Sequence, residues 1–244
     1  MINVAVMGAT GRMGKLALEL IDASQDLRLH AALDSSSEIS AITGADVVFD
    51  VTNLGASKSI VDYCIDTGAR VLVGTSGWTT ADHLHLAKRL ESAPTGAAVV
   101  IVPNFSIGSM LASKFAAEAA KHFDSIEIIE SHHEGKKDSP SGTAIYTAEL
   151  ISDSRRDLVQ PLITGVGQQA RGEVVAGVPV HSMRLAGVSA EQDVRLTRES
   201  ESLSIRHAAT SIRAYEPGIL AAIRFTARAK GLTVGLAAVI ESEN

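Results

Sequence analysis

The sequence is poor in cysteine, in aromatic residues and in positive charge, and each shortage excludes a class of function. A single cysteine, Cys64, can form no intramolecular disulfide and no thiolate-rich zinc site, so we expect a protein of the reducing cytoplasm. Aromatic residues make up 4% of the chain, too few for a platform that stacks single-stranded nucleic acid. With 22 Lys and Arg against 28 Asp and Glu, the net charge of −6 argues against nucleic acid as a partner.

Long apolar runs are missing as well. The longest, such as 97–102 and 236–240, fall far short of the roughly 20 residues that cross a membrane. No basic region precedes the first apolar residues, so we expect neither a signal peptide nor a membrane partner. Hydrophobic residues at 45% and charged residues at 20% indicate a globular chain, and 244 residues suffice for one large domain or two modest ones.

The first hundred residues alternate between apolar strands and helical patterns. Because these strands are apolar on both faces, helices are expected on both sides of a parallel sheet. The pattern predicts a Rossmann-like, doubly wound α/β sheet whose ligand lies beyond the carboxyl ends of the strands. The predicted strands are 2–7, 27–33, 46–51, 70–73 and 97–102, with helices near 12–21, 57–67 and 80–92.

The rhythm changes after Pro103, where strands begin to follow one another without helices between them. This indicates a second, α+β domain with an open, mostly antiparallel sheet. A final helix and apolar segment can return to the first domain. We therefore predict a first domain over 1–106 and 214–244, and a second domain over 107–213. The predicted elements after Pro103 are helices at 110–123, from 142 and at 219–229, strands at 125–131, 173–180, 180–188, 192–197 and 203–208, and an apolar segment at 232–240.

A glycine-rich loop follows the first strand. Its glycines permit a sharp turn and a close approach of pyrophosphate to the backbone, and the helix that follows offers free N–H groups. Asp34 ends the second strand, 20 residues beyond Gly14, where a carboxylate meets the ribose of a dinucleotide. A purely structural turn is the alternative, but the order of strand, loop, helix, strand and acid favours dinucleotide binding. The residues from this loop that we predict to contact the cofactor are Gly8, Ala9, Thr10, Gly11, Arg12 and Met13.

The choice between NADH and NADPH depends on the residues just after Asp34. Three serines, at 35–37, stand there, and no cation is present to meet a 2′-phosphate. This favours NADH. Arg12 could still reach a phosphate from the glycine loop, so use of NADPH as well stays open.

A second cluster packs two histidines and two lysines into six positions, from His132 to Lys137, shortly before a predicted helix. Lysine and histidine can donate protons, and the N–H groups near Gly142 and Thr143 can bind a carboxylate. By itself the cluster is equally well explained as a solvated polar loop. We expect no metal site, because the adjacent residues His132 and His133 point to opposite faces of a strand.

These motifs occur in the order found in the dihydrodipicolinate reductase family, which the chain resembles over essentially its whole length. Besides the glycine loop, the resemblance is carried by Gly74-Thr75-Ser76-Gly77, Val102-Pro103-Asn104-Phe105-Ser106-Ile107-Gly108, His132-His133 through Lys136 to Pro140-Ser141-Gly142-Thr143-Ala144, and His181-Ser182-Met183-Arg184-Leu185. The resemblance implies hydride transfer from NADH or NADPH to a small cyclic dicarboxylate of lysine and diaminopimelate biosynthesis, by a homotetramer.

The resemblance implies that 1–106 with 214–244 is a dinucleotide-binding domain and that 107–213 is a substrate-binding and oligomerisation domain. It also assigns roles residue by residue. His132 and Lys136 match the proton donors, and His133, Gly142 and Thr143 match the substrate contacts. Cofactor contacts extend to Gly74, Thr75, Ser76, Val102, Pro103, Asn104 and Phe105. Glu134 departs from the family pattern, and we expect it to face solvent or pair with Lys137. One alternative is another two-domain reductase of the aspartate pathway, for which we would expect a nucleophilic cysteine or a different lysine context. The other is a non-catalytic NAD(H)-binding protein.

Overall fold

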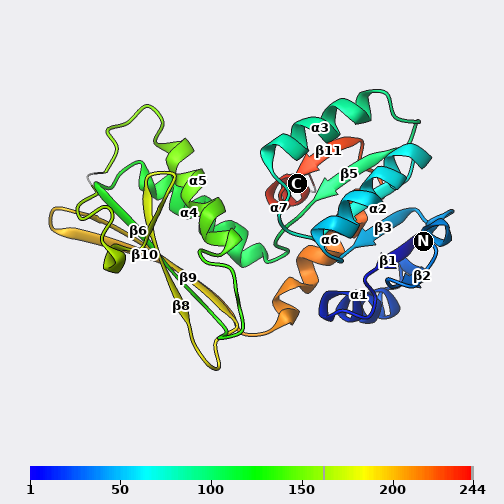
Figure 1. The fold of residues 1–244 in the computed structure, drawn as a ribbon, viewed down its shortest axis with the longest axis horizontal. Helices are drawn as coiled ribbons and strands as arrows, with labels where there is room; N and C mark the ends of the chain where they lie inside the picture. The colour runs from blue at the N-terminus through cyan, green and yellow to red at the C-terminus, as the bar shows by residue number, and fades with distance from the viewer. Residues whose placement is uncertain (162, 243–244) are drawn as a thin grey trace. The chain divides into compact units, whose positions relative to one another are not determined.

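The computed structural model describes residues 1–161 and 163–242, so the last two positions of the domain predicted to end at 244 lie outside the described residues. The chain divides into two compact units (Figure 1). Unit 1 comprises Met1–Ser106 and Ile212–Asn244, and unit 2 comprises Ile107–Ser211. The chain therefore leaves unit 1 once, after Ser106, and returns to it at Ile212.

Unit 1 is built on a six-stranded parallel sheet in the order β11-β5-β4-β3-β1-β2. Its strands are β1 (Ile2–Met7), β2 (Leu27–Leu33), β3 (Val47–Asp50), β4 (Arg70–Val73), β5 (Ala98–Ile101) and β11 (Gly231–Val234). Its helices are α1 (Arg12–Ala23), α2 (Leu54–Thr67), α3 (Thr80–Glu91), α6 (Glu216–Thr226) and α7 (Leu236–Glu241), with short 3-10 turns at Ile39–Ile42 and Ile212–Tyr215.

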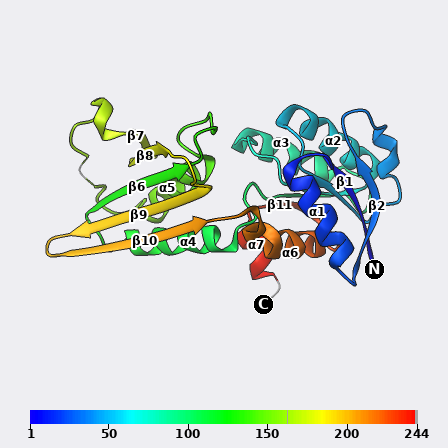
Figure 2. The same cartoon turned by 90° about the horizontal axis from the view of Figure 1, so that it is seen from below.

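Helices lie on both faces of this sheet, with α1, α6 and α7 on one side and α2 and α3 on the other (Figure 2). The central strands are consequently buried on both faces, which explains their unbroken apolar sequences. The order of the strands reverses at β1, because β2 pairs on one side of it and β3 on the other. Ligands of such sheets bind beyond the carboxyl ends of the strands at this reversal. The predicted Rossmann-like sheet is confirmed.

Unit 2 carries a five-stranded mixed sheet in the order β10-β9-β6-β8-β7, in which only β6 and β8 run parallel. Helices α4 and α5 pack on one face of the sheet, around a core of alanine and branched aliphatic side chains. The elements are α4 (Ile107–Ala120), β6 (Ser125–His132), α5 (Gly142–Ser154), a 3-10 turn at Gln169–Arg171, β7 (Glu173–Val175), β8 (Val178–Arg184), β9 (Ala190–Arg198) and β10 (Glu201–Ala209). The predicted second unit with an open, mostly antiparallel sheet is confirmed.

One predicted strand of unit 2 is wrong. The apolar run at 173–180 is a tight hairpin, not a single strand, with Val175 paired to Val178 across a two-residue turn. Both turn residues adopt a positive φ, +48° at Ala176 and +81° at Gly177. Turns of this kind match the twist of the paired strands, and glycine favours them. An alanine in the first turn position concealed this hairpin in the sequence.

Candidate active site

The glycine loop connects β1 to α1 at the carboxyl edge of the unit 1 sheet. Gly8 has a φ of +86°, and its N–H and that of Ala9 both donate to the carbonyl oxygen of Leu33, at 2.9 and 3.0 Å. A Cβ on Gly14 would lie 2.1 Å from the carbonyl oxygen of Gly8, so only glycine fits there. The loop is therefore closed tightly between β1, β2 and the first turn of α1.

The amino end of α1 is open to an anionic ligand. Its N-cap residue, Gly11, has no side chain to bond the first N–H groups, and the first turn holds no acidic residue. Thr10, Gly11 and Arg12 are exposed, while Met13 is half-buried. An uncapped helix end with these exposed neighbours suits a phosphate group.

Asp34 follows β2 at the same edge of the sheet. Its Oδ1 accepts hydrogen bonds from the N–H of Ser36 (2.9 Å), the hydroxyl of Ser36 (2.7 Å) and the hydroxyl of Ser37 (3.1 Å). The hydrogen bonds from Ser36, and then that from Ser37, lower the pKa of Asp34. The carboxylate is thus ionised and held at the end of the strand, leaving Oδ2 for a further donor.

A buried acid that the sequence analysis did not single out lies at the same edge of the sheet, on the strand between β1 and β4. Asp50 ends β3 and is fully buried. Its carboxylate accepts hydrogen bonds from the hydroxyl (2.5 Å) and N–H (3.0 Å) of Thr52, from the hydroxyl of Ser57, and from the hydroxyl of Thr75 (3.2 Å). Thr75 belongs to the predicted cofactor loop of Gly74, Thr75 and Ser76, so Asp50 fixes that loop to the adjacent strand. The only hint in the sequence was an acid at the end of an apolar strand.

The segment after β5 is held by close backbone packing. The ring of Phe105 is 2% exposed and meets Phe49 edge-on at 5.6 Å. A Cβ on Gly74 would lie 2.8 Å from the Phe105 ring, and one on Gly218 would lie 2.0 Å from its carbonyl oxygen. Gly218, at the start of α6, was also missed. Of the other predicted residues in this segment, Val102 is buried, Asn104 half-buried and Pro103 exposed. Phe105 thus has a packing role in the structure.

In unit 2, β6 ends at His132, whose side chain is 16% exposed. Its Nδ1 lies 2.5 Å from Oε2 of Glu130, a carboxylate that is fully buried. Burial raises the pKa of Glu130, but hydrogen bonds from His132, Arg184 and Ser182 outweigh it and lower the pKa to about 2. Glu130 is therefore ionised at neutral pH, and sequence reasoning had given it no role.

Lys136 lies on the loop between β6 and α5, with its side chain 20% exposed. Its Nζ lies 2.6 Å from Oδ2 of Asp138, and this hydrogen bond lowers the pKa of Asp138. The N–H of Lys136 donates to the carbonyl oxygen of His133 at 3.0 Å, which closes a turn. His133 and Glu134 are exposed. The predicted orientation of Glu134 toward solvent agrees with this exposure.

The amino end of α5 completes the unit 2 residues predicted from the sequence. Ser141 caps the helix by accepting the N–H of Ala144 at 3.2 Å, and the first turn holds no acidic residue. A Cβ on Gly142 would meet no atom of the chain within 4 Å, so packing does not require glycine there. The carbonyl oxygen of Thr143 accepts the hydroxyl of Thr147 (2.8 Å), which joins a buried cluster with Ser113 and Gln192. His132, Lys136 and the start of α5 thus all adjoin the carboxyl end of β6.

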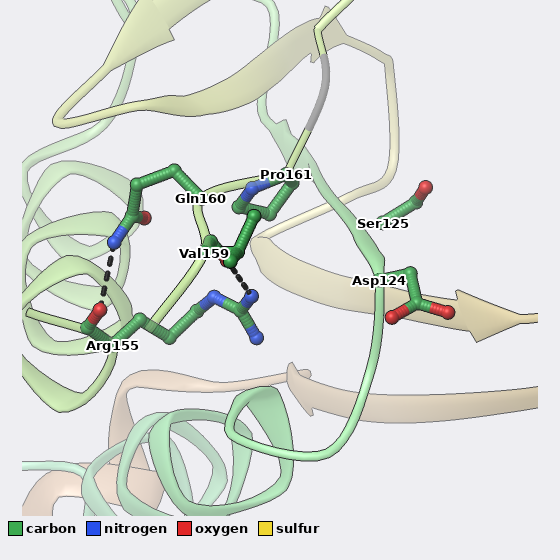
Figure 3. Close-up of a pocket in the computed structure, with 6 residues that line it drawn as sticks. All are labelled: Asp124, Ser125, Arg155, Val159, Gln160 and Pro161. Carbon is green, nitrogen blue, oxygen red and sulfur yellow. Dashed lines mark hydrogen bonds between the residues drawn. The ribbon is translucent and has the colours of Figure 1, made fainter. Parts of the chain in front are cut away.

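A pocket of about 330 Å³ in unit 2 is lined by none of the predicted site residues. Its cation, Arg155, donates to the carbonyl oxygen of Val159 (Figure 3). Arg155 also donates to the carbonyl oxygens of Ala120 and Phe123 and so closes the carboxyl end of α4. The side chain of Gln160 donates back to the carbonyl oxygen of Arg155 at 2.7 Å. The lining residues are Asp124, Ser125, Arg155, Val159, Gln160 and Pro161. The burial of Arg155 is therefore explained by its hydrogen bonds to the carbonyl groups at the end of α4.

Two further features bear on the class of protein. Among the residues described, no cluster of three or more His, Cys, Asp or Glu side chains could hold a metal ion, and no helix is long and apolar enough to cross a membrane. Cys64 is fully buried in α2, and burial raises the pKa of its thiol to about 12. The sole cysteine therefore has neither the exposure nor the ionisation of a nucleophile.

The doubly wound sheet of unit 1 and the histidine and lysine of unit 2 place the chain among the two-unit, pyridine-nucleotide-dependent oxidoreductases. Two family models match it, "Dihydrodipicolinate reductase, N-terminus" over residues 2–105 and "Dihydrodipicolinate reductase, C-terminus" over 108–240. The chain belongs to the dihydrodipicolinate reductase family.

Relatives along the whole chain agree. The 4-hydroxy-tetrahydrodipicolinate reductase of Clavibacter sepedonicus is 47% identical over 241 residues, covering 99% of this chain and 87% of the relative. That of Mycolicibacterium smegmatis is 39% identical over 244 residues, covering 98% and 99%. Among solved structures, a dipicolinate-bound dihydrodipicolinate reductase from Paenisporosarcina sp. TG-14 matches with a TM-score of 0.80 at 29% identity, over 97% of this chain and 98% of that one.

Proposed function

We propose that this protein reduces 4-hydroxy-tetrahydrodipicolinate (dihydrodipicolinate) to tetrahydrodipicolinate with NADH or NADPH, in diaminopimelate and lysine biosynthesis. The observation that carries this proposal is the arrangement at the end of β6, where His132 and Lys136, the two predicted proton donors, precede the first turn of α5. The curated relatives named for this reaction match nearly the full chain. Unit 1 would bind the nucleotide and unit 2 the substrate.

The residues at the carboxyl edge of unit 1 fit a dinucleotide. Gly14 lacks a side chain where a Cβ would clash with the loop, and Gly8 adopts a left-handed conformation. Together with the uncapped amino end of α1, this leaves backbone N–H groups accessible to pyrophosphate. Oδ2 of Asp34 is placed to accept from a ribose hydroxyl. Gly74, Thr75, Ser76 and the segment Val102–Phe105 follow β4 and β5 at the same edge, where we propose that they contact the nicotinamide half. A bound reduced nicotinamide would supply the hydride.

NADH serves at least as well as NADPH in this proposal. Oδ1 of Asp34 already accepts hydrogen bonds from Ser36 and Ser37, and the negative charge of the carboxylate opposes a 2′-phosphate. Arg12 is exposed on the glycine loop and supplies the cation with which NADPH would also be accepted.

In unit 2, the substrate would be held as a dianion. His133 offers a donor, and the N–H groups at Gly142 and Thr143 lie at the positive end of α5. The absence of chain atoms around a Cβ at Gly142 supports close approach of a ligand carboxylate to that backbone. A solved relative with dipicolinate bound supports a small cyclic dicarboxylate as the ligand.

His132 and Lys136 would deliver the proton that accompanies the hydride. Hydride addition builds negative charge on the ring, and an acid nearby neutralises that charge as it forms. His132 donates from Nε2, because its Nδ1 faces the carboxylate of Glu130. Lys136 would donate from Nζ, which pairs with Asp138 in this structure.

We also propose that the open sheet of unit 2 builds a homotetramer. Its outer side presents alternating ion pairs, Asp193 with Arg195 (2.7 Å) and Glu191 with Arg206 (2.7 Å), beside the exposed side chain of Met183. Charges of both signs on one flat surface can pair with a second copy related by symmetry. Analytical ultracentrifugation at micromolar protein should give four times the chain mass of 25.5 kDa.

The test of the activity is oxidation of NADH followed at 340 nm, with substrate made in situ by a dihydrodipicolinate synthase. Turnover that depends on both the substrate and the nucleotide is the expected result. Turnover with an aspartate-pathway semialdehyde instead, or nucleotide binding without any turnover, would overturn it. The semialdehyde alternative lacks its nucleophile, because Cys64 is buried with a raised pKa.

A further inference from the structure

Glu130 is a fully buried carboxylate beside the predicted proton donor His132. It precedes His132 by two residues on β6, so both side chains leave the strand on the same side. Its Oε2 lies 2.5 Å from Nδ1 of His132 and accepts from Arg184 at 3.0 Å. Its Oε1 accepts from Arg184 at 3.1 Å and from the N–H of Ser141 at 3.2 Å.

A carboxylate in such a place is unfavourable unless donors surround it. In this site each oxygen has two donors, and these outweigh burial and hold the pKa of Glu130 at about 2. An ionised carboxylate can only accept hydrogen bonds. The hydrogen between Glu130 and His132 must therefore belong to Nδ1 of the imidazole, whether the ring is neutral or protonated.

We infer that Glu130 is the positioning residue of this site: it orients His132 so that Nε2 is the nitrogen that exchanges the proton, and it anchors the Lys136 loop through Arg184. This inference rests on the proposed function, since it assigns Glu130 an effect on the same proton transfer.

Arg184 extends the effect of Glu130 to Lys136. Its guanidinium is paired with both oxygens of Glu130, and its remaining N–H groups donate to the carbonyl oxygens of Lys136 (3.2 Å) and Asp138 (2.6 Å). The backbone on both sides of position 137 is thus tied to the Glu130–Arg184 pair. Since Ser141 also donates to Glu130, the imidazole, the lysine loop and the cap of α5 meet at one carboxylate.

The neighbouring strands β8 and β9 and the first turn of α5 place no second acidic side chain opposite Glu130 among the described residues. Opposite it, β9 presents the neutral Gln192, and opposite His132 it presents Ala190. From β8 come Ser182 and Arg184, and α5 has no acidic residue in its first turn. The ionisable groups of the loop are His133, Glu134, Lys136, Lys137 and Asp138.

The chain offers a matched control on the same strand. Glu127 also accepts from an arginine and a histidine, Arg171 at 2.5 Å and His181 at 2.8 Å, but it lies on the opposite side of β6. Glu127→Gln therefore removes the same charge from the same kind of cluster without touching His132 or the Lys136 loop.

The experiment compares Glu130→Gln with Glu127→Gln in steady-state kinetics from pH 5 to 10. For Glu130→Gln we expect kcat to fall by about 10–100-fold, with the KM for NADH unchanged. We also expect the pH profile of kcat to change, because the ionised carboxylate beside the proton donor is lost. Glu127→Gln should match the unsubstituted protein in all three. Binding of NADH, followed by energy transfer from Trp78, shows whether the variant is folded.

A measurement on the unsubstituted protein keeps the inference testable even if Glu130→Gln does not fold. Long-range ¹⁵N NMR, with the His132 signals assigned by their loss in His132→Gln, should show the hydrogen of the neutral ring on Nδ1. A hydrogen on Nε2 would overturn the inference. So would a Glu130→Gln variant with normal kcat and pH profile, or one that loses NADH binding along with turnover. If the unsubstituted protein itself shows no turnover, the proposed function fails, while the NMR result still decides the geometry.

Discussion

The hydroxyl of Thr75, in the loop after β4, donates a 3.2 Å hydrogen bond to the buried carboxylate of Asp50 at the end of β3. Through this bond the loop proposed to contact nicotinamide is tied to the central part of the sheet. The carboxylate also holds Thr52 and Ser57, so the turn after β3, the start of α2 and the loop after β4 form one polar cluster.

Thr75→Val tests this link. The substitution keeps the shape of the side chain but removes the hydroxyl, leaving Asp50 with three of its four donors. We expect the free energy of unfolding to fall by about 1 kcal/mol and the Kd for NADH to rise. Urea denaturation and NADH titration measure the two effects. Thr80→Val, at the exposed start of α3, is the control, and equal effects of the two variants would contradict the link.

Substitution of alanine at two glycines should affect different properties of the protein. At Gly14 the new Cβ would lie 2.1 Å from a backbone oxygen, so we expect Gly14→Ala to lose about 1–3 kcal/mol of stability and to bind NADH weakly. At Gly142 the Cβ meets nothing, so Gly142→Ala should keep its Tm and its NADH affinity while the KM for the dicarboxylate rises. Calorimetry and steady-state kinetics separate the two. Unchanged NADH binding by Gly14→Ala would show that the loop does not approach the nucleotide.

Lys136→Ala should separate chemistry from nucleotide binding. Removing a positioned proton donor lowers kcat by about 10²–10⁴-fold, whereas unit 1 and its NADH affinity are unaffected. Energy transfer from Trp78, the sole tryptophan, reports the binding. Lys137→Ala, which removes the neighbouring exposed lysine, is the matched control. If Lys136→Ala retains most of its turnover, the assignment of this lysine is wrong.

Cofactor preference should follow the charge at the end of β2. We expect kcat/KM for NADH to equal or exceed that for NADPH, and Asp34→Ala to shift the ratio toward NADPH because the carboxylate no longer repels a 2′-phosphate. Asp22→Ala removes an equal charge from the exposed side of α1 and should leave the ratio unchanged. A preference of the unsubstituted protein for NADPH above tenfold, about 1.4 kcal/mol, would contradict the proposal.

The buried thiol predicts a pH dependence of stability. The pKa of Cys64 is about 12 in the folded protein against an ordinary 9.0, chiefly because of burial. Above pH 9 the unfolded chain therefore releases a proton that the folded chain retains, and stability is lost as the pH rises from 9 to 12. Cys64→Ala should show a shallower loss over this range in urea denaturation. Labelling with a thiol reagent at pH 8 should occur only when the protein unfolds, and rapid labelling of the folded protein would contradict the burial.

The sequence alone was sufficient for the parallel sheet and for the motif residues. Helices cover both sides of the sheet, so strands such as 70–73 and 97–102 are apolar on both faces. Their burial could therefore be predicted from their unbroken apolar sequences. The glycine loop, Asp34 and the His132–Lys136 cluster are likewise local patterns. The role of the last of these, and that of the segments after β4 and β5, came from the family resemblance and not from any spacing.

Only the tertiary structure decided which polar groups hold these motifs in place. Glu130 and Arg184 are separated by 54 positions, and Asp50 and Thr75 by 25. Their pairing depends on the register of neighbouring strands, which no local periodicity specifies. The same holds for Gly218 against Phe105, where two distant backbones approach too closely for any side chain. A sequence records a residue's type and its near neighbours, whereas burial and long-range partners, which give Glu130 its charge and its donors, exist only once the chain has folded.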